Sequence, residues 1–415
     1  MKAIRNFIFI IFVSIILGII LMCSAYSIPN NNIRENISSS INLLLREGGY
    51  NSWLGFSGRK FYSTADGATD AIMLNNALYY ENDSIIFNAM MNPRKIFKIN
   101  ENTNNDNILI EILAESVKNN NNASINFYPR YWHGYLIFLK PLLNFFTVAQ
   151  LRIINFILQV SILILIIAKL FKRTNFKFIL AFILSIIFID PVNSAKCFQY
   201  SGVYYITLIS ILVMLSKNFN YLYLFLLNGI LTAFIDFLTY PLTTLGIPLI
   251  IYLILNPESK LITIFKFSLS WLMGYSGMWS GKWLANYFFT GYNIFSDVSN
   301  AINDRIHGTS AYFGRSVTWN LVYDHVKNLN YSWIIALIFI ASIIIFLAII
   351  LRAVKLKITS LNNILPLIVV SLYPVIWFAL LQNHSIIHYF FTYKIFSITF
   401  FAVLVILIKC LNYEK

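Results

Sequence analysis

Charged residues are scarce in this chain of 415 residues. They make up 12% of it, against about a quarter in an average soluble protein, while hydrophobic residues make up 58%. Acidic side chains are the rarer kind, with 17 Asp and Glu against 31 Lys and Arg and a net charge of +14. This composition excludes an ordinary soluble enzyme and indicates an integral membrane protein. Because a strongly basic balance is also typical of nucleic-acid-binding domains, the placement of the charges decides between the two interpretations.

Cysteine and the common catalytic motifs are also lacking. The three cysteines, Cys23, Cys197 and Cys410, are far apart and show no CxxC or Cys/His spacing, so neither a disulfide framework nor a zinc site is supported. The chain has no Walker motif and no GxSxG motif. No Asp or Glu falls in the middle of an expected span, where ion-coupled carriers place ionisable groups. These absences make a transporter the less favoured class.

Long apolar stretches are what the chain has instead. Lys2 and Arg5 precede an apolar run from Phe7 to Met22, which exceeds the roughly 7 to 15 residues of a secretory signal. We therefore expect an uncleaved first membrane helix, with a cleaved signal peptide as the alternative. Nine further stretches approach or exceed the length of about 20 residues that crosses a bilayer: 148–171, 176–190, 199–216, 219–236, 237–255, 261–285, 331–351, 362–381 and 391–411.

The fold class that follows is all-α. We expect a polytopic transmembrane helix bundle of about 10 spans with a large, helical first extracytoplasmic segment. Apolar spacing within that segment predicts helices over 36–47, 69–80 and 106–118, and an interfacial helix over 131–146. The chain then divides into five regions: a first helix (1–28), the extracytoplasmic segment with its interfacial helix (29–147), a transmembrane bundle (148–285), an extracytoplasmic loop (286–330) and C-terminal transmembrane helices (331–415).

The basic residues predict the orientation. Fourteen of them and only two acidic residues, Glu258 and Glu414, fall in the termini and in loops on one side of the expected spans, a net charge of +12 on that side. Basic short loops are typical of the cytoplasmic face. The charge excess is thereby explained by topology, and nucleic-acid binding is no longer needed to explain it. Both termini are expected in the cytoplasm of a cell membrane, and 15 of the 17 acidic residues are expected at the opposite face.

Two carboxylates stand in the first outer segment, just before an apolar helical run. Asp66 and Asp70 are four residues apart, so on one helix face they would repel. We therefore expect Asp66 to cap the helix and Asp70 to lie in its first turn, where the anion is stabilised. Such a carboxylate suits a general base or a metal ligand, and capping alone is the structural alternative for both.

Three other regions contain candidate anion-binding groups. Arg130 and His133 lie in the aromatic run 128–135, which also fits an aromatic belt at the membrane surface. His384 and His388 have helical i, i+4 spacing, with Lys394 shortly after, but lack the Glu of a zincin motif. The outer loop 286–330 contributes two more candidates, Arg305 and Arg315. Glycines 274, 277 and 281 recur on one expected helix, where they indicate close helix packing.

This arrangement resembles the GT-C superfamily of polytopic membrane glycosyltransferases, with Asp66 and Asp70 as the residues that match. The resemblance implies a polyprenyl-phosphate-linked sugar as donor and transfer to a cell-envelope glycan or lipid at the extracytoplasmic face. It implies catalysis by Asp70, with Asp66 beside it. The expected ligands of the donor phosphate are Arg130, His133, Arg305, Arg315, His384, His388 and Lys394. Trp53 and Trp132 are candidates for stacking on a sugar.

Two other functions stay open. One is an O-antigen ligase or polymerase, which also uses a lipid-linked sugar, and the other is a flippase-type transporter for polysaccharide or lipid. No cofactor is indicated, and a divalent metal remains open. The glycosyltransferase interpretation expects Asp70, Arg130 and His384 or His388 to converge on one cavity.

Overall fold

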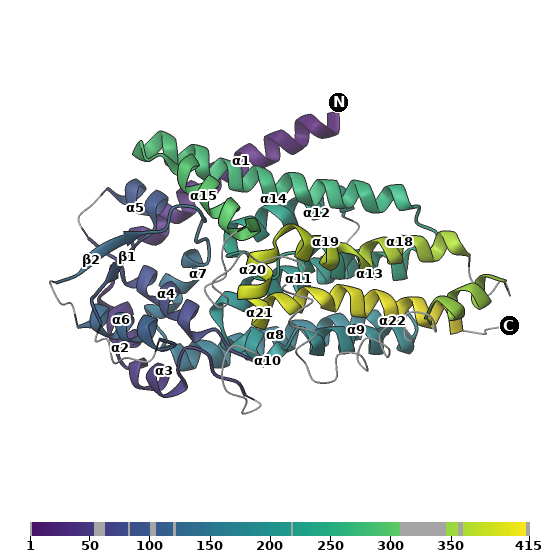
Figure 1. The fold of residues 1–415 in the computed structure, drawn as a ribbon, viewed down its shortest axis with the longest axis horizontal. Coiled ribbons are helices and arrows are strands. Elements are labelled where there is room, and N and C mark those ends of the chain that lie inside the picture. Colours follow the sequence, from purple (N-terminus) through teal and green to yellow (C-terminus); the bar gives the residue numbers. More distant parts are fainter. Residues whose placement is uncertain are drawn as a thin grey trace. The chain divides into compact units, whose positions relative to one another are not determined.

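The computed structural model describes residues 2–53, 63–81, 84–99, 105–118, 122–216, 219–307, 346–355 and 360–411. The chain forms two compact units, and Figure 1 shows its helices and strands coloured along the sequence. The first unit comprises Met1–Ile166, Asp190–Leu245 and Phe267–Val298, and the second comprises Ile167–Ile189, Gly246–Lys266 and Ser299–Lys415. Both consist almost wholly of helices. The sequence prediction of an α-helical membrane protein agrees with this composition.

Five helical segments in the described parts of the chain are long and apolar enough to cross a membrane: Ile4–Tyr26, Val148–Leu170, Phe198–Ser216, Leu361–Leu380 and Tyr389–Leu411. Three apolar helices are shorter, α9 (Phe176–Phe188), α12 (Tyr221–Ile235) and α13 (Thr243–Leu255). The helix α14 (Leu261–Thr290) is longer, with 30 residues. The predicted span 331–351 lies largely outside the described residues.

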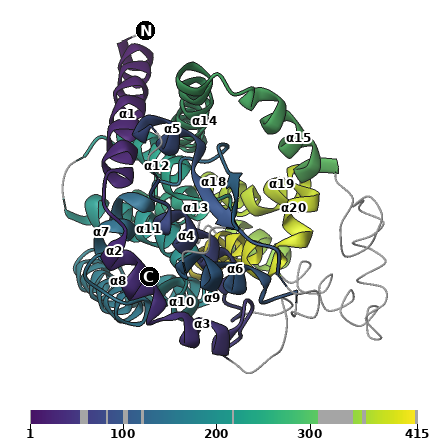
Figure 2. The same ribbon diagram turned by 90° about the vertical axis from the view of Figure 1, so that its left-hand side faces the viewer.

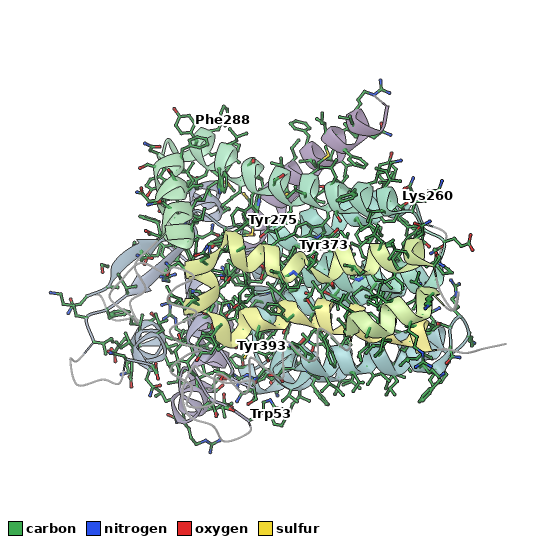
Figure 3. The ribbon with its side chains drawn as sticks, turned by 45° about the vertical axis from the view of Figure 1, so that its right-hand side comes forward. Trp53, Lys260, Tyr275, Phe288, Tyr373 and Tyr393 are labelled. Atoms are coloured by element: carbon green, nitrogen blue, oxygen red, sulfur yellow. The ribbon has the colours of Figure 1, made fainter. Side chains whose placement is uncertain are left out.

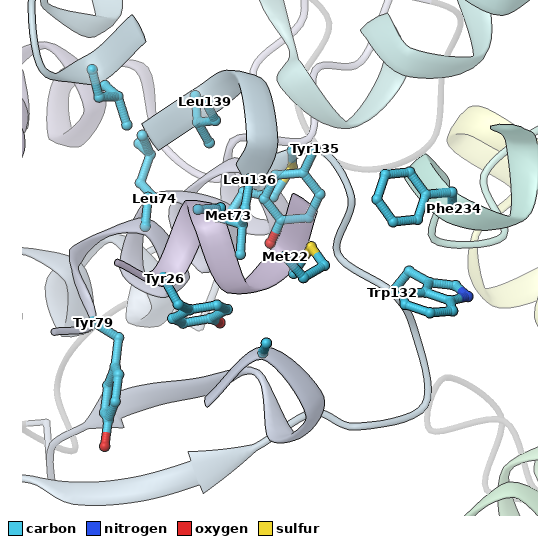
Figure 4. Packing of buried hydrophobic residues seen from close by; sticks show 14 of the residues in the cluster. Met22, Tyr26, Met73, Leu74, Tyr79, Trp132, Tyr135, Leu136, Leu139 and Phe234 are labelled. Atoms are coloured by element: carbon cyan, nitrogen blue, oxygen red, sulfur yellow. The ribbon is translucent and has the colours of Figure 1, made fainter. Parts of the chain in front are cut away.

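The first unit begins with α1 (Lys2–Tyr26), which is an integral part of its core. Met22 and Tyr26 from α1 are buried against Trp132, Tyr135 and other apolar side chains (Figure 4). The polar segment that follows forms the helices α2 (Asn31–Ser38), α3 (Ile41–Glu47), α4 (Gly67–Leu78), α5 (Ile85–Met91), α6 (Ile108–Val117) and α7 (Leu136–Leu143). The helices expected over 69–80 and 106–118 are confirmed, and the one expected over 36–47 is divided into α2 and α3.

Two short strands interrupt this helical segment. The strands β1 (Pro93–Ile96) and β2 (Ser124–Phe127) pair antiparallel, with Pro93 opposite Phe127. The sequence did not predict them, because each has only four residues and their pairing joins positions about 30 residues apart. The fold is therefore nearly all-α rather than all-α.

The rest of the first unit is built on α8 (Val148–Leu170), α10 (Pro191–Lys196), α11 (Phe198–Ser216), α12 and α14. Close packing between α12 and α14 depends on glycine: a Cβ at Gly274 would lie 2.2 Å from the carbonyl oxygen of Leu226. The next glycines of the series, Gly277 and Gly281, face Ile11 and Ile15 of α1, so α1 lies beside α14 (Figure 2). The expected close-packing face is confirmed.

The second unit is a smaller bundle. It includes α9, most of α13, α18 (Leu361–Ser371), α19 (Tyr373–Leu380) and α20 (Gln382–Ile387). The chain ends with α21 (Tyr389–Thr392), a 3-10 turn (Tyr393–Phe396) and α22 (Ser397–Leu411). Phe182 of α9 packs on Phe401 of α22, with ring centroids 6.0 Å apart. Gly246 of α13 contacts Ile398 of α22, since a Cβ at this glycine would lie 2.6 Å from the Ile398 side chain. Helix α22 thus packs on both α9 and α13.

Candidate functional site

Asp66 and Asp70 lie at the start of α4, and the structure gives them different roles. The two carboxylate oxygens of Asp66 accept hydrogen bonds from the backbone N–H and the hydroxyl of Thr69, both at 2.9 Å. Asp66 is therefore the N-cap that the sequence predicted. Asp70 lies in the first turn and is fully buried.

The carboxylate of Asp70 points at the start of a second helix. Its Oδ1 accepts the backbone N–H of Gln199, at 3.2 Å, in the first turn of α11. The other oxygen, Oδ2, is buried and has no hydrogen-bond partner within the described structure. A carboxylate with one unused oxygen can accept a proton or a hydrogen bond from a bound molecule.

Burial raises the pKa of Asp70 to about 7, and the positive charge of Arg152 opposes that rise. Arg152 belongs to α8 and donates to Glu47 at 2.7 Å and to the carbonyl oxygen of Lys196 at 3.0 Å. Lys196 also pairs with Glu47, at 3.2 Å. Glu47 thus pairs with both Arg152 and Lys196, and Arg152 supplies a fixed positive charge near Asp70.

The local chain geometry explains why Glu47 reaches this position. Helix α3 ends at Glu47, and Gly48 follows with a positive φ of 76° that favours glycine. The next residue, Gly49, approaches the backbone so closely that a Cβ there would lie 1.9 Å from the carbonyl oxygen of Asp106. Its carbonyl oxygen accepts the N–H of Ala68 in α4. The two glycines therefore bring the end of α3 to the start of α4.

A large apolar cavity lies within the first unit. Its volume is about 650 Å³, and its walls come from α7, α8, α11 and α12 together with Met73 of α4. Met73 follows Asp70 by one helical turn, and Phe198, which also lines the cavity, precedes the Gln199 N–H that binds Asp70. Residues close to Asp70 in the fold thus line the cavity, although Asp70 itself is not one of its lining residues.

The polar side chains around this cavity bond to one another rather than pointing into it. Asn155 donates to Ser201 at 2.7 Å and accepts from Tyr205 at 2.7 Å. Asn228 donates to Ser210 at 2.7 Å. The interior consequently presents hydrocarbon. Its volume falls in the range of about 300–1,000 Å³ that is typical of ligand pockets.

Two predicted ligand residues of the first unit, Arg130 and His133, have other partners. The guanidinium of Arg130 pairs with Asp297 at 2.6 Å and lies 5.1 Å from the ring centroid of Tyr128. His133 is buried, and its ring nitrogens contact the carbonyl oxygen of Tyr128 at 2.9 Å and the hydroxyl of Tyr135 at 3.1 Å. Burial and the nearby charge of Lys282 hold the pKa of His133 well below its ordinary value. Its imidazole is therefore neutral and belongs to the core.

The two candidate tryptophans also differ. Trp132 is 1% exposed, and its indole N–H donates to the carbonyl oxygen of Met278 at 2.8 Å. The structure thus places Trp132 in the core, away from any surface on which a sugar stacks. Trp53 is 47% exposed (Figure 3) and donates to Asp190 at 3.2 Å. Its ring remains accessible for stacking.

The remaining candidates belong to the second unit. Arg305 approaches His388, with Nη1 and Nε2 3.5 Å apart, and the rings of His384 and His388 have centroids 4.8 Å apart. Asn383 donates to the carbonyl oxygen of Asp304, which ties α20 to the end of α15 (Ile294–His307). This cluster groups three of the predicted phosphate ligands. Lys394 is fully buried and donates to the carbonyl oxygen of Ile189 at 2.7 Å.

Arg315 lies outside the described residues. Asp70 and Arg130 belong to the first unit, whereas His384 and His388 belong to the second, so their expected convergence stays a prediction. Within the described residues, no group of three or more His, Cys, Asp or Glu side chains is placed to hold a metal ion.

The sequence did not predict that Arg152 and the backbone N–H of Gln199 lie close to Asp70, or that Glu47 pairs with Arg152. A signal for Arg152 was present, because an arginine near the start of an otherwise apolar stretch is expensive in a membrane and is often functional. Glu47 and Gln199 gave no such signal, since only the fold brings them to α4.

Comparison of the chain with protein-family models, with curated proteins and with solved structures found no match. The function must therefore be argued from the site itself.

The buried carboxyl gives the first prediction. Folding raises the pKa of Asp70 from 3.8 to about 7. Between these two pH values the carboxyl is protonated in the folded state and ionised in the unfolded state. The stabilisation from this proton is complete below pH 3.8 and is lost as the pH rises to about 7. Asp70→Asn stays neutral, so its melting temperature relative to wild type should be higher at pH 8 than at pH 5.

Melting curves of the purified protein in detergent measure this difference. Glu258→Gln, at an exposed carboxylate, is the control and should show the same difference from wild type at both pH values. If Asp70→Asn also showed no change between pH 5 and pH 8, Asp70 would not titrate in that range.

Proposed function

We propose that this chain is a membrane glycosyltransferase that moves a sugar from a polyprenyl-phosphate donor to a cell-envelope glycan or lipid. The observation on which the proposal rests is that Met73 and Phe198, which neighbour Asp70 and its partner Gln199, line the apolar cavity. Asp70 is a buried carboxylate with one unused oxygen and a pKa near 7, and the cavity presents hydrocarbon. A lipid-linked substrate needs both a polar reaction centre and an apolar channel.

Asp70 acts as the general base in this proposal. A base is most effective when its pKa lies close to the working pH, and the balance of burial against the charge of Arg152 supports a value in that range. Oδ2 removes the proton from an acceptor hydroxyl. The new glycosidic bond forms as the bond between the sugar and the polyprenyl phosphate breaks.

The lipid chain of the donor occupies the cavity between α7, α8, α11 and α12. The leaving phosphate requires cationic ligands, because negative charge develops on it in the transition state. Arg305, His384 and His388 form a cluster within the second unit and stay predicted ligands. Arg130, Arg315 and Lys394 remain candidates.

The topology in this proposal has about ten spans and both termini in the cytoplasm. The basic loops support this orientation, and in it α4 and Asp70 belong to the extracytoplasmic face. A lipid-linked donor is the form in which an activated sugar is available there, which agrees with the apolar cavity.

The direct test is an assay of transfer. Full-length protein in detergent is incubated with a panel of polyprenyl-phosphate hexoses and pentoses that carry a labelled sugar, together with a cell-envelope extract as acceptor. Since general acid–base catalysis contributes about 100-fold or more, Asp70→Asn should reduce transfer by at least that factor. The matched control Glu258→Gln should retain wild-type transfer.

Equal transfer by Asp70→Asn and wild type would refute the role of the base. No transfer by wild type from any donor, together with movement of lipid-linked sugar across a vesicle membrane, would establish the transporter alternative.

The cavity provides an independent prediction. Ile209 lines it and is 47% exposed, so Ile209→Trp should fill part of the space that the lipid occupies. We expect transfer from a long-chain donor to fall by about 10-fold and transfer from a short-chain analogue to change much less. Ile164→Trp, at an exposed position of α8 outside the cavity, is the control. An equal loss for both chain lengths would contradict chain binding in this cavity.

A further inference from the structure

A second cavity in the first unit has the opposite character. Its volume is about 200 Å³, and polar side chains dominate its lining. It lies where the start of α2, the C-terminal half of α4, β1 and the end of α6 meet. Its lining includes Asn30, Asn31, Arg34, Asn75, Tyr80 and Lys95. This is room for one small polar molecule.

This cavity is distinct from the site at Asp70. Asn75 follows Asp70 by five residues on α4, which corresponds to about 7.5 Å along the helix axis, and it points to another face. No residue lines both cavities. A ligand of the polar cavity therefore does not require the lipid-binding space.

A fixed guanidinium gives the polar cavity its charge. Nη1 of Arg34 donates to the carbonyl oxygens of Ser116 and Val117 at the end of α6, at 2.9 and 3.0 Å. These bonds hold the guanidinium in place, and within the described part of the chain its partners are carbonyl oxygens and include no carboxylate. Lys95, by contrast, pairs with Glu81 at 2.9 Å. The lining therefore presents one uncompensated positive charge.

Amide and phenol groups complete the lining. Asn75 is 3% exposed and is held by its bond to the carbonyl oxygen of Lys95, at 2.8 Å. Asn30 donates to the carbonyl oxygen of Leu78, at 2.7 Å, and does not cap α2 with its side chain. Tyr80, which is 47% exposed, adds an aromatic ring. Fixed amides beside an aromatic ring suit a ligand with several hydroxyl groups.

We propose that this polar cavity binds an anionic sugar, whose carboxylate or phosphate pairs with Arg34 and whose hydroxyls bond to the amides of Asn30, Asn31 and Asn75. One positive charge matches one acidic group. The proposal concerns binding alone and does not depend on the role of Asp70.

Calorimetric titration of the full-length protein in detergent tests it. The probes are glucuronate, glucose 6-phosphate, glucose and inorganic phosphate. At least one acidic sugar should bind 10-fold or more tightly than both glucose and inorganic phosphate. The stronger of the two acidic sugars identifies whether the carboxylate or the phosphate is the natural group.

Variants of Arg34 and Lys95 test whether the acidic sugar binds in this cavity. Arg34→Gln should weaken binding of the acidic sugar by at least 10-fold and leave any binding of glucose unchanged. Because Arg34 also holds the end of α6, Lys95→Gln provides a second variant, which should weaken binding less. Arg46→Gln, at an exposed arginine on the neighbouring α3, is the matched control and should bind as wild type does.

Three results would overturn the proposal. They are equal binding of glucose and the acidic sugars, binding of inorganic phosphate as tight as that of glucose 6-phosphate, and wild-type affinity in a folded Arg34→Gln protein. None of these results depends on transfer, so failure here is distinguishable from failure of the proposed enzymatic function.

Discussion

The proposed chemistry of this protein depends on the burial of the Asp70 carboxyl. An ionised carboxylate removed from water is costly unless it is paired, and at Asp70 the compensation is partial. One oxygen accepts a backbone N–H from α11, the other has no partner within the described structure, and Arg152 acts from α8. The result is a carboxyl group balanced between its two protonation states near neutral pH.

Several contacts in the first unit fix the position of α4 and of Arg152 around Asp70. Asp66 fixes the first turn of α4 through Thr69, and the glycines after α3 bring Glu47 to Arg152. The same helices that surround Asp70 line the apolar cavity, because Met73 and Phe198 adjoin both. A single local arrangement thus joins an acid–base group to a space suited to hydrocarbon, which is why a lipid-linked substrate is the proposal that fits best.

The sequence predicted the parts of this arrangement that depend on local pattern. Apolar spacing located α4 and α6, the Asp66 cap followed from its place before a helix, and the glycines of α14 indicated close packing. It could not predict the partners of Asp70, since Glu47 and Gln199 reach it only through tertiary structure. It also predicted exposed functions for His133 and Trp132, whose aromatic context fits a membrane surface as well as the core in which they lie.

The most direct test of the central claim is a titration of Asp70 itself. Infrared difference spectra of wild type minus Asp70→Asn, recorded in detergent from pH 4 to pH 9, isolate the carbonyl stretch of its protonated form. We predict that this band disappears with a midpoint near pH 7, because burial raises the pKa of Asp70 and the charge of Arg152 only partly opposes that rise. A midpoint near the ordinary value of about 3.9 for an aspartate would contradict it.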